Sequence, residues 1–346
     1  MAAAVLASCG NIDYLKDDRM LRQMAFPAAG PDGDDALSAT TNMSDRDDIK
    51  TPKLNAYEGA VYVKPPQINN YGTVSLAYAI DVPPGRRGMQ PSVSLSYSSS
   101  GGDGLAGIGW SLSTGLGVIS RATKNGQLYY DHRDTFTYNG QRLVRTEGPA
   151  GSENGVYRLE IESGFSKFIL SNAESGGVWR VIDKAGTVTT FGETGASRIY
   201  HPDDARKTYI WNFCKSVDLN GNFMTAEYDD SSYSENHILY LKEIRYTGND
   251  REGMPARQYV RFAYRDRDEA YVSKAPGFIM RMDRLLDRVT VGWDDPAGLM
   301  ETELWSYRPV YGTSADSGRP VLVTVESERH TTKPEFIYQE ALHSFS

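Results

Sequence analysis

Alternation of apolar and polar positions is the clearest pattern in this chain, and it predicts β-strands. Between residues 74 and 82 every second position is apolar and the positions between are small or polar: Val74, Leu76, Tyr78, Ile80 and Val82. Because successive side chains of a strand point to opposite faces, this pattern predicts a strand with one buried face. Pro83-Pro84-Gly85 should end that strand, since proline has no N–H to donate to a sheet. Val93, Leu95 and Tyr97 then predict the returning strand.

Short runs rich in tyrosine and valine, separated by polar turns, continue along the chain. Asn125-Gly126 and Asn139-Gly140 are strong signals for two-residue hairpin turns, whose central positions both need positive φ. A degenerate repeat is also present, in which Trp179, Asp183-Lys184-Ala185-Gly186 and Phe191 correspond to Trp211, Asp218-Leu219-Asn220-Gly221 and Tyr228. Each unit predicts a hairpin with an Asp-x-x-Gly turn.

Further strands are expected over 239–246, 258–264, 285–293, 301–311 and 321–328. Helical patterns occur only near Tyr14 to Met24 and over Ile279 to Leu286. No element after Tyr338 is predicted to cover the edge of the last strand. These patterns therefore predict an all-β fold built from antiparallel hairpins and meanders. A short N-terminal helix is compatible with this prediction.

Composition narrows the class of protein. The 33 glycines, 16 prolines and 22 tyrosines agree with strands joined by turns. With 37 Lys and Arg against 45 Asp and Glu the net charge is −8, which argues against a nucleic-acid partner, because such proteins need a positive surface to displace counterions. No apolar run approaches the roughly 20 residues of a membrane-spanning helix.

The N-terminal region suggests an exported protein. Leu6-Ala7-Ser8-Cys9 follows a short apolar stretch and resembles the lipobox at which bacterial lipoproteins are lipidated on cysteine. Residues 1–9 are thus a candidate truncated lipoprotein signal, with Cys9 as the lipidated residue, although a frayed terminus with an incidental cysteine is the alternative. Residues 10–56 are polar and rich in aspartate, as expected of a tether. Residues 57–338 form the β domain, and 339–346 a tail that we expect to continue in a longer protein.

A glycine-rich passage follows the first predicted hairpin. Gly102, Gly104 and Gly107 satisfy the G-x-G-x-x-G pattern of dinucleotide sites. Such a site needs a helix directed at the pyrophosphate, and here the sequence runs into Trp110 and Leu112 at strand spacing. Close packing of backbone is the better interpretation.

The run from Ile80 to Ser99, continued by 104–112 and closed by Ile119-Ser120-Arg121, forms one long pattern. Its characteristic residues are Pro83, Pro84, Gly85, Gly88, Pro91, Leu95, Tyr97, Gly104, Gly107, Gly109, Trp110 and Arg121. It resembles the N-terminal domain of the SpvB family, which also opens the B components of Tc insecticidal toxins and many Rhs or YD-repeat proteins. The block from Trp211 to Tyr228 and Pro334-Glu335-Phe336-Ile337-Tyr338 resemble the same family.

The resemblance implies a large curved sheet or open shell and a structural role. The chain would be a non-enzymatic shell segment of an exported, toxin-related protein, secreted or lipid-anchored at the outer membrane. Its partner would be a downstream YD-repeat or toxin segment, or another toxin component. A surface lipoprotein that binds glycan or protein through exposed aromatics is the alternative. An ADP-ribosyltransferase-linked toxin component comes third.

Candidate catalytic patterns in the chain are incomplete. Two Glu-x-Glu pairs, Glu160-Ile161-Glu162 and Glu301-Thr302-Glu303, are each expected on one strand face, but the Ser-Thr-Ser motif of a transferase is missing. No serine satisfies G-x-S-x-G, and the histidines are far apart. Asp218, Asn220 and Asn222 begin like a calcium loop, yet Phe223 stands where that loop needs glycine. We therefore predict no catalytic, cofactor or metal residues.

Two remaining patterns have structural interpretations. Basic and aromatic residues interleave over 257–267, together with enough acids to predict a solvated strand face with cross-strand ion pairs. Trp110, Trp179 and Trp211 lie in apolar strand patterns and should be buried. Cys214 is expected to be a small buried hydrophobe.

Overall fold

The computed structural model describes residues 72–122, 127–295, 300–330 and 333–338, together with strands Val5–Ser8 and Gln67–Ile68. In this part of the chain nearly every element is a strand, and α2 (Tyr233–Asn236) is a single helical turn. The all-β prediction is therefore confirmed. Several expected features lie outside the described residues: the helix at Tyr14 to Met24, Cys9, the tether over 10–56, the tail and the Asn125-Gly126 turn.

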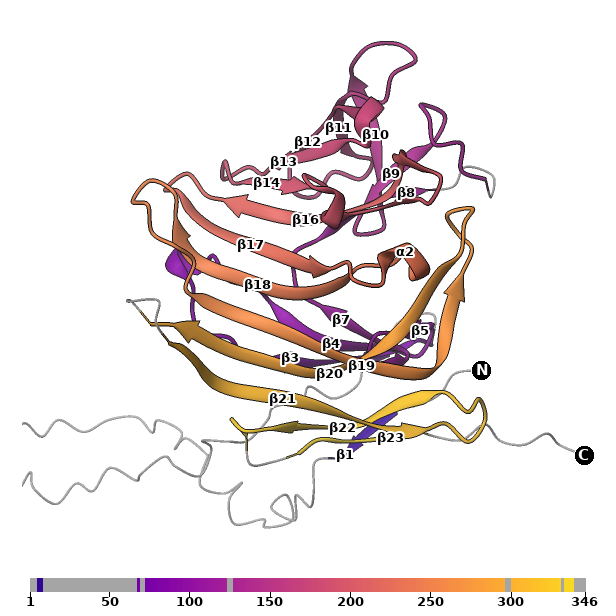
Figure 1. Cartoon of the computed structure of the whole chain (residues 1–346), viewed down its shortest axis with the longest axis vertical. Coiled ribbons are helices and arrows are strands. Elements are labelled where there is room, and N and C mark those ends of the chain that lie inside the picture. Colours follow the sequence, from indigo (N-terminus) through magenta and orange to yellow (C-terminus); the bar gives the residue numbers. More distant parts are fainter. Residues whose placement is uncertain are drawn as a thin grey trace, which may run out of the picture.

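Eight antiparallel strands close into a barrel at one end of the molecule (Figure 1). Each strand pairs with the next, and the last pairs with the first through Ile210 opposite Ser120. The strands are β8 (Val118–Ala122), β9 (Thr135–Tyr138), β10 (Gln141–Glu147), β11 (Gly155–Leu159), β12 (Lys167–Ser171), β13 (Val178–Ile182), β14 (Val188–Phe191) and β16 (Asp204–Val217). A short strand, β15 (Arg198–His201), pairs with the first half of β16.

From β16 the sheet continues as an open, strongly curved meander (Figure 1). It contains β17 (Asn222–Asp229), β18 (Tyr240–Asn249), β19 (Gln258–Ser273), β20 (Met280–Asp294), β21 (Glu301–Thr313), β22 (Pro320–Ser327) and β23 (Glu335–Tyr338). The far edge of β23 is paired, because β1 (Val5–Ser8) lies antiparallel to it. The residues after Tyr338, where no covering element is expected, lie outside the described part of the chain. The helix expected at Ile279 to Leu286 is wrong, since Met280 to Leu286 lie in strand β20.

A smaller sheet packs on one face of this meander. It consists of β2 (Gln67–Ile68), β3 (Val74–Ile80), β4 (Val93–Ser98) and β7 (Trp110–Ser113), and the two-residue strands β5 (Asp103–Gly104) and β6 (Gly107–Ile108) lie in the β4–β7 connection. In β3 buried and exposed residues alternate as the sequence predicts.

Hydrogen bonds that involve aromatic side chains join the two sheets. The indole N–H of Trp110 donates to the Tyr338 hydroxyl at 2.7 Å, and the backbone N–H of Asp81 donates to the Tyr307 hydroxyl at 3.1 Å. The Tyr78 and Tyr307 rings meet edge to face. Buried tyrosine and tryptophan need partners for their polar atoms, and these bonds fix how the layers lie on one another.

The predicted turns are formed by the expected residues. Asn139 and Gly140 both have positive φ, as a two-residue hairpin turn requires. The two Asp-x-x-Gly turns join β13 to β14 and β16 to β17, and in each the aspartate accepts backbone N–H groups two and four residues ahead. This local chemistry confirms the hairpins of the degenerate repeat.

Candidate functional site

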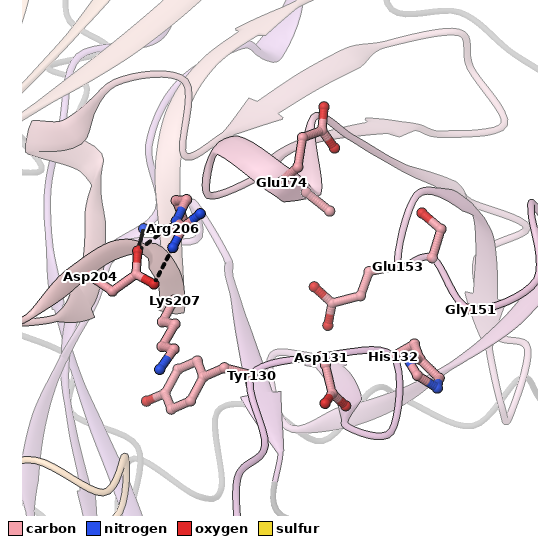
Figure 2. A pocket seen from close by; sticks show the side chains of 11 residues that line it. Tyr130, Asp131, His132, Gly151, Glu153, Glu174, Asp204, Arg206 and Lys207 are labelled. Carbon is pink, nitrogen blue, oxygen red and sulfur yellow. Dashed lines mark hydrogen bonds and ion pairs between the residues drawn. The ribbon is translucent and has the colours of Figure 1, made fainter.

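Loops at one end of the barrel surround a cavity of about 400 Å³ (Figure 2). The β8–β9 and β10–β11 loops, the turn before β13 and the first residues of β16 contribute to its wall. The lining residues are Tyr130, Asp131, His132, Gly151, Ser152, Glu153, Ala173, Glu174, Asp204, Arg206 and Lys207. The motif residue Arg121 reaches this barrel-mouth cavity through its ion pair with Glu153, one of the lining residues.

Arg121, the last residue of the long motif, lies buried beneath the cavity. Its guanidinium pairs with Asp134 at 3.2 Å and with both carboxylate oxygens of Glu153, and its Nε donates to the carbonyl of Thr208 at 3.1 Å. The ring centroid of Phe136 is 5.0 Å from the guanidinium carbon. A buried arginine with two carboxylates is thus fully engaged in holding the loops of the barrel mouth.

Asp134 anchors the β8–β9 loop on the same network. Its carboxylate accepts the backbone N–H groups of Tyr129 and Tyr130 as well as the bond from Arg121. The sequence analysis missed Asp134 and Glu153, which lie 13 and 32 residues from Arg121 along the chain. No local spacing rule connects them, because strand pairing brings them together.

The carboxylates around the rim are held ionised by nearby donors. Hydrogen bonds from Arg133 lower the pKa of Asp131 to about 2, and those from Arg206 lower the pKa of Asp204 to about 2. Hydrogen bonds from its own backbone N–H and from Asn154 lower the pKa of Glu174. Burial raises the pKa of the Tyr130 hydroxyl. The pKa values of these carboxyls and of the Tyr130 hydroxyl are thus shifted away from neutral pH, where a general acid or base works best. Among the described residues there is also no cluster of three or more potential metal ligands.

The glycine-rich passage forms tight strand contacts. A Cβ on Gly104 would lie 2.0 Å from the Trp110 carbonyl oxygen, and one on Gly107, which has φ +94°, would lie 2.7 Å from that of Pro320. Gly109 has φ +76° and lies against the Tyr97 ring. Strands β6 and β7 follow where a dinucleotide site would need a helix.

A buried ion pair fixes this passage to the open sheet. Asp103 pairs with Arg267 of β19, and both side chains are almost completely enclosed. The Leu105 carbonyl also accepts the backbone N–H of Leu286 at 2.8 Å. The passage therefore connects the small sheet to β19 and β20.

The proline-containing turn makes equally close contacts. A Cβ on Gly85 would lie 1.9 Å from the carbonyl oxygen of Met89, and Gly88 has φ +80°. The Pro83 carbonyl accepts the Tyr246 hydroxyl at 3.0 Å. Pro84 is exposed and Pro91 is buried, while Leu95 and Tyr97 face the core.

The residues considered for transferase chemistry do not come together. Glu160 and Glu162 lie in the β11–β12 loop, so their expected place on a strand face is wrong. Glu160 pairs with Arg142, and Glu162 accepts the backbone N–H of Phe165. Glu301 does lie on β21, where it forms two bonds of 2.6 and 2.7 Å with Arg261.

The interleaved basic and aromatic stretch behaves as a strand with cross-strand ion pairs. Arg261 of β19 also pairs with Glu243 of β18, which agrees with the predicted cross-strand ion pairs. Tyr259 and Phe262 are buried. Trp110, Trp179 and Trp211 are buried as predicted, whereas Cys214 is only half-buried.

Comparison with known protein families identifies a match over most of the described chain. Residues 68–275 match the family model described as Salmonella virulence plasmid 65kDa B protein, SpvB. Curated relatives include the mono(ADP-ribosyl)transferase SpvB of Salmonella choleraesuis strain SC-B67 and that of Salmonella typhimurium, each 29% identical over 193 residues. The match covers 46% of this chain and only 32% of those relatives.

Solved structures share the fold. The N-terminal domain of effector protein SpvB from Salmonella typhimurium strain LT2 superposes with a TM-score of 0.60 at 21% identity, covering 72% of this chain and 97% of that domain. A TcdB2-TccC3 crystal structure gives a TM-score of 0.63 at 21% identity over 78% of this chain and 16% of that one. The Photorhabdus luminescens Tc holotoxin pore gives 0.65 at 20% identity, covering 78% and 15%. In the described part of the chain no helix is long and apolar enough to cross a membrane.

Proposed function

Because the chain belongs to the SpvB family, we propose that it is a structural module of an exported, toxin-related protein, and that its sheets form part of a shell that encloses or presents another segment. The structural relatives include Tc toxin assemblies, TcdB2-TccC3 and a Tc holotoxin pore. The partner we propose is a YD-repeat or toxin segment that follows in the same protein or belongs to another toxin component.

The observation that carries this proposal is a double-layered wall, one face of which has only small, uncharged side chains over three strands. On β3, β4 and β7 the side chains that point away from the open sheet are all serine or alanine: Ser75, Ala77, Ala79, Ser94, Ser96, Ser98, Ser111 and Ser113. They lie opposite one another in register across these three strands. This part of the face carries no charge and no large side chain, so another polypeptide layer can approach it closely.

The opposite face of the open sheet has a different character. Glu227, Glu243, Arg245 and Arg261 form ion pairs there with one another and with neighbouring strands. A charged face suits the exterior of a shell, and a face of small uncharged side chains suits contact with a second layer.

Co-expression tests the proposal. The reading frames on both sides of the coding sequence are first searched for a YD-repeat or toxin segment. The full chain is then expressed with that segment, and co-purification and protease resistance of the segment are measured. We expect the segment to co-purify and to be protected. Ala77→Arg should abolish both effects, because it places a charge on the face of small side chains, whereas the matched Glu227→Arg on the charged face should leave them unchanged. A segment that is equally sensitive with and without the chain would overturn the proposal.

A second assay addresses the non-enzymatic part of the proposal. Purified chain is incubated with NAD and release of nicotinamide is measured. We expect the release to equal that of buffer. Turnover that disappears in Glu160→Gln or Glu162→Gln would show that the loop carboxylates are catalytic and would overturn this part.

Lipid attachment at Cys9 belongs to the same proposal, and its support is the Leu6-Ala7-Ser8-Cys9 sequence. Cells that express the chain are grown with radiolabelled palmitate. Label in the wild type and its loss in Cys9→Ser would support an anchored protein, and equal absence of label from both would exclude the anchor.

A further inference from the structure

Strand β1 occupies the outer edge of β23, although the two strands come from opposite ends of the sequence. Four residues of each strand lie opposite one another, from Val5 opposite Tyr338 to Ser8 opposite Glu335. In Figure 1 the indigo β1 lies beside the yellow β23 at the end of the open sheet. On its other side β23 pairs with β22 through Glu335 opposite Thr324. Without β1, no strand of the described chain would cover the outer edge of β23.

The residues of β1 are also the residues that precede the cysteine of the lipobox. A lipobox is cleaved immediately before its cysteine, which here is at the bond between Ser8 and Cys9. This cleavage removes Val5–Ser8 and therefore all of β1. The strand and a processed Cys9 exclude one another, so β1 covers β23 only in the uncleaved chain.

Strand β23 does not depend on β1 for its position. The Phe336 side chain is 2% exposed, and its ring centroid lies 4.7 Å from that of Trp110. The Tyr338 hydroxyl accepts the indole N–H of Trp110 at 2.7 Å and donates to the carbonyl of Leu322 on β22. These contacts come from the small sheet and from β22, so they persist when β1 is removed. The uncovered β23 would be a fixed strand with unpaired backbone groups along one side.

The edge of β23 lacks the features that keep a terminal strand from pairing. Natural edge strands carry lysine, proline, bulges or inward-pointing charges. Within Glu335–Tyr338 there is no lysine or proline, and the register with β1 is regular. Glu335 is the only charged residue of the strand, and Ile337 is 48% exposed. Such an edge suits an extended, uncharged segment that binds by strand addition.

We propose that the edge of β23 is the docking site for a strand of the partner segment, and that β1 covers this site until residues 1–8 are cleaved off. The inference rests on the proposed function, which supplies the partner, a YD-repeat or toxin segment. In the cleavage a peptidase hydrolyses the Ser8–Cys9 amide bond. The hydroxyl of one water molecule goes to the Ser8 carbonyl and its proton to the Cys9 nitrogen. The partner strand then extends the open sheet beyond β23.

Hydrogen–deuterium exchange of the uncleaved chain tests whether β1 covers the edge. The full chain is expressed without export, and exchange is measured over residues 335–338. We expect Leu6→Pro combined with Ala7→Pro to lower the protection of these residues about tenfold, because proline has no N–H to donate to the sheet. Ala2→Pro combined with Ala3→Pro, before β1, is the matched control and should leave the protection unchanged.

A peptide tests whether the uncovered edge accepts a strand. The probe is the blocked hexapeptide Ala-Ala-Val-Leu-Ala-Ser, the sequence of residues 3–8. It should restore protection of residues 335–338 in the Leu6→Pro/Ala7→Pro variant and have no effect on the wild type, whose edge is occupied. The fully N-methylated peptide, which has no backbone N–H, should not restore it. Strand β19 should stay protected throughout and report that the sheet is folded.

Three results of these exchange experiments would overturn the proposal. The first is equal protection of residues 335–338 in the wild type and in the Leu6→Pro/Ala7→Pro variant. The second is an uncovered edge that the hexapeptide does not protect. The third is protection of the variant that rises with protein concentration, since a second copy of the chain would then be the occupant of the edge.

Co-expression separates this inference from the proposed function. In cells that export the chain together with the partner segment, Cys9→Ser blocks cleavage and keeps β1, so less of the segment should co-purify. Adding Leu6→Pro and Ala7→Pro to Cys9→Ser should restore co-purification. Equal co-purification with the wild type and with Cys9→Ser would overturn the covering role of β1 and leave the proposed function standing. A segment that co-purifies with neither, while the hexapeptide still protects the edge, would overturn the proposed function and the choice of partner.

Discussion

A Cβ atom at Gly104 would lie 2.0 Å from the Trp110 carbonyl oxygen, whereas one at Gly102 would meet nothing within 4 Å. We therefore predict that Gly104→Ala lowers the free energy of unfolding by about 3 kcal/mol, as overpacking against backbone does. Gly102→Ala is the matched control and should change it by less than about 0.5 kcal/mol. Urea unfolding followed by tryptophan fluorescence measures both, and equal effects would contradict the packing role of Gly104.

Arg121 gives a second prediction at the residue scale. Arg121→Ala leaves the carboxylates of Asp134 and Glu153 without their shared cation, and we expect a loss of about 3–5 kcal/mol in unfolding free energy. Arg206→Ala, which removes an exposed pair with Asp204, should have little effect. The same urea experiment distinguishes them. A small effect of Arg121→Ala would mean that the two acids find other partners.

These two residues show what local sequence can and cannot predict. The need for glycine at position 104 could be predicted from the sequence. The glycine-rich passage runs into Trp110 and Leu112 at strand spacing, which predicts close packing of backbone. The partners of Arg121 come from the loop after β8 and the loop before β11. Only strand pairing decides which loops meet at a barrel end, so this network could not be predicted from spacing.

Elements whose chemistry is local were predicted best. The Asp-x-x-Gly turns formed as expected because the aspartate bonds its own turn. The helix that the sequence pattern predicts over Ile279 to Leu286 is wrong. Its residues pair with β19, including Leu286 opposite Tyr264, so partners distant in sequence overrode the local preference.

The charged ladder across β18, β19 and β21 leads to a prediction about acid. Hydrogen bonds from Arg261 hold the pKa of Glu301 below its ordinary value of 4.5. A lowered folded-state pKa adds stability that is complete above the ordinary value and is lost as the pH falls through the folded value. The difference in stability between wild type and Glu301→Gln should thus be largest near pH 7 and shrink below pH 4.5.

Chemical unfolding at pH 7, 5, 4 and 3.5 would show this trend. Glu303→Gln on the same strand is the matched control and should give a difference that varies less with pH. If the difference in unfolding free energy between wild type and Glu301→Gln stays constant across the series, the bonds between Glu301 and Arg261 do not persist in solution.

At the scale of the whole molecule, the strand patterns predict the all-β class and the long motif predicts the family. The large curved sheet is an expectation that the family resemblance adds. Closure of the barrel was not predicted. It depends on β16 pairing with β8, where Trp211 lies opposite Ile119 and Asn212 opposite Val118. A contact between strands so far apart in the chain has no local signature.

Strand β16 belongs to both the barrel and the open sheet, and its 14 residues pair with four other strands. A pull that separates the two parts would load this strand along its length. Shear of that kind must break several backbone hydrogen bonds together, whereas peeling an edge breaks them one after another. The barrel and the meander should therefore resist mechanical separation as a single unit, and stretching the molecule should first peel the short strands at the far edge.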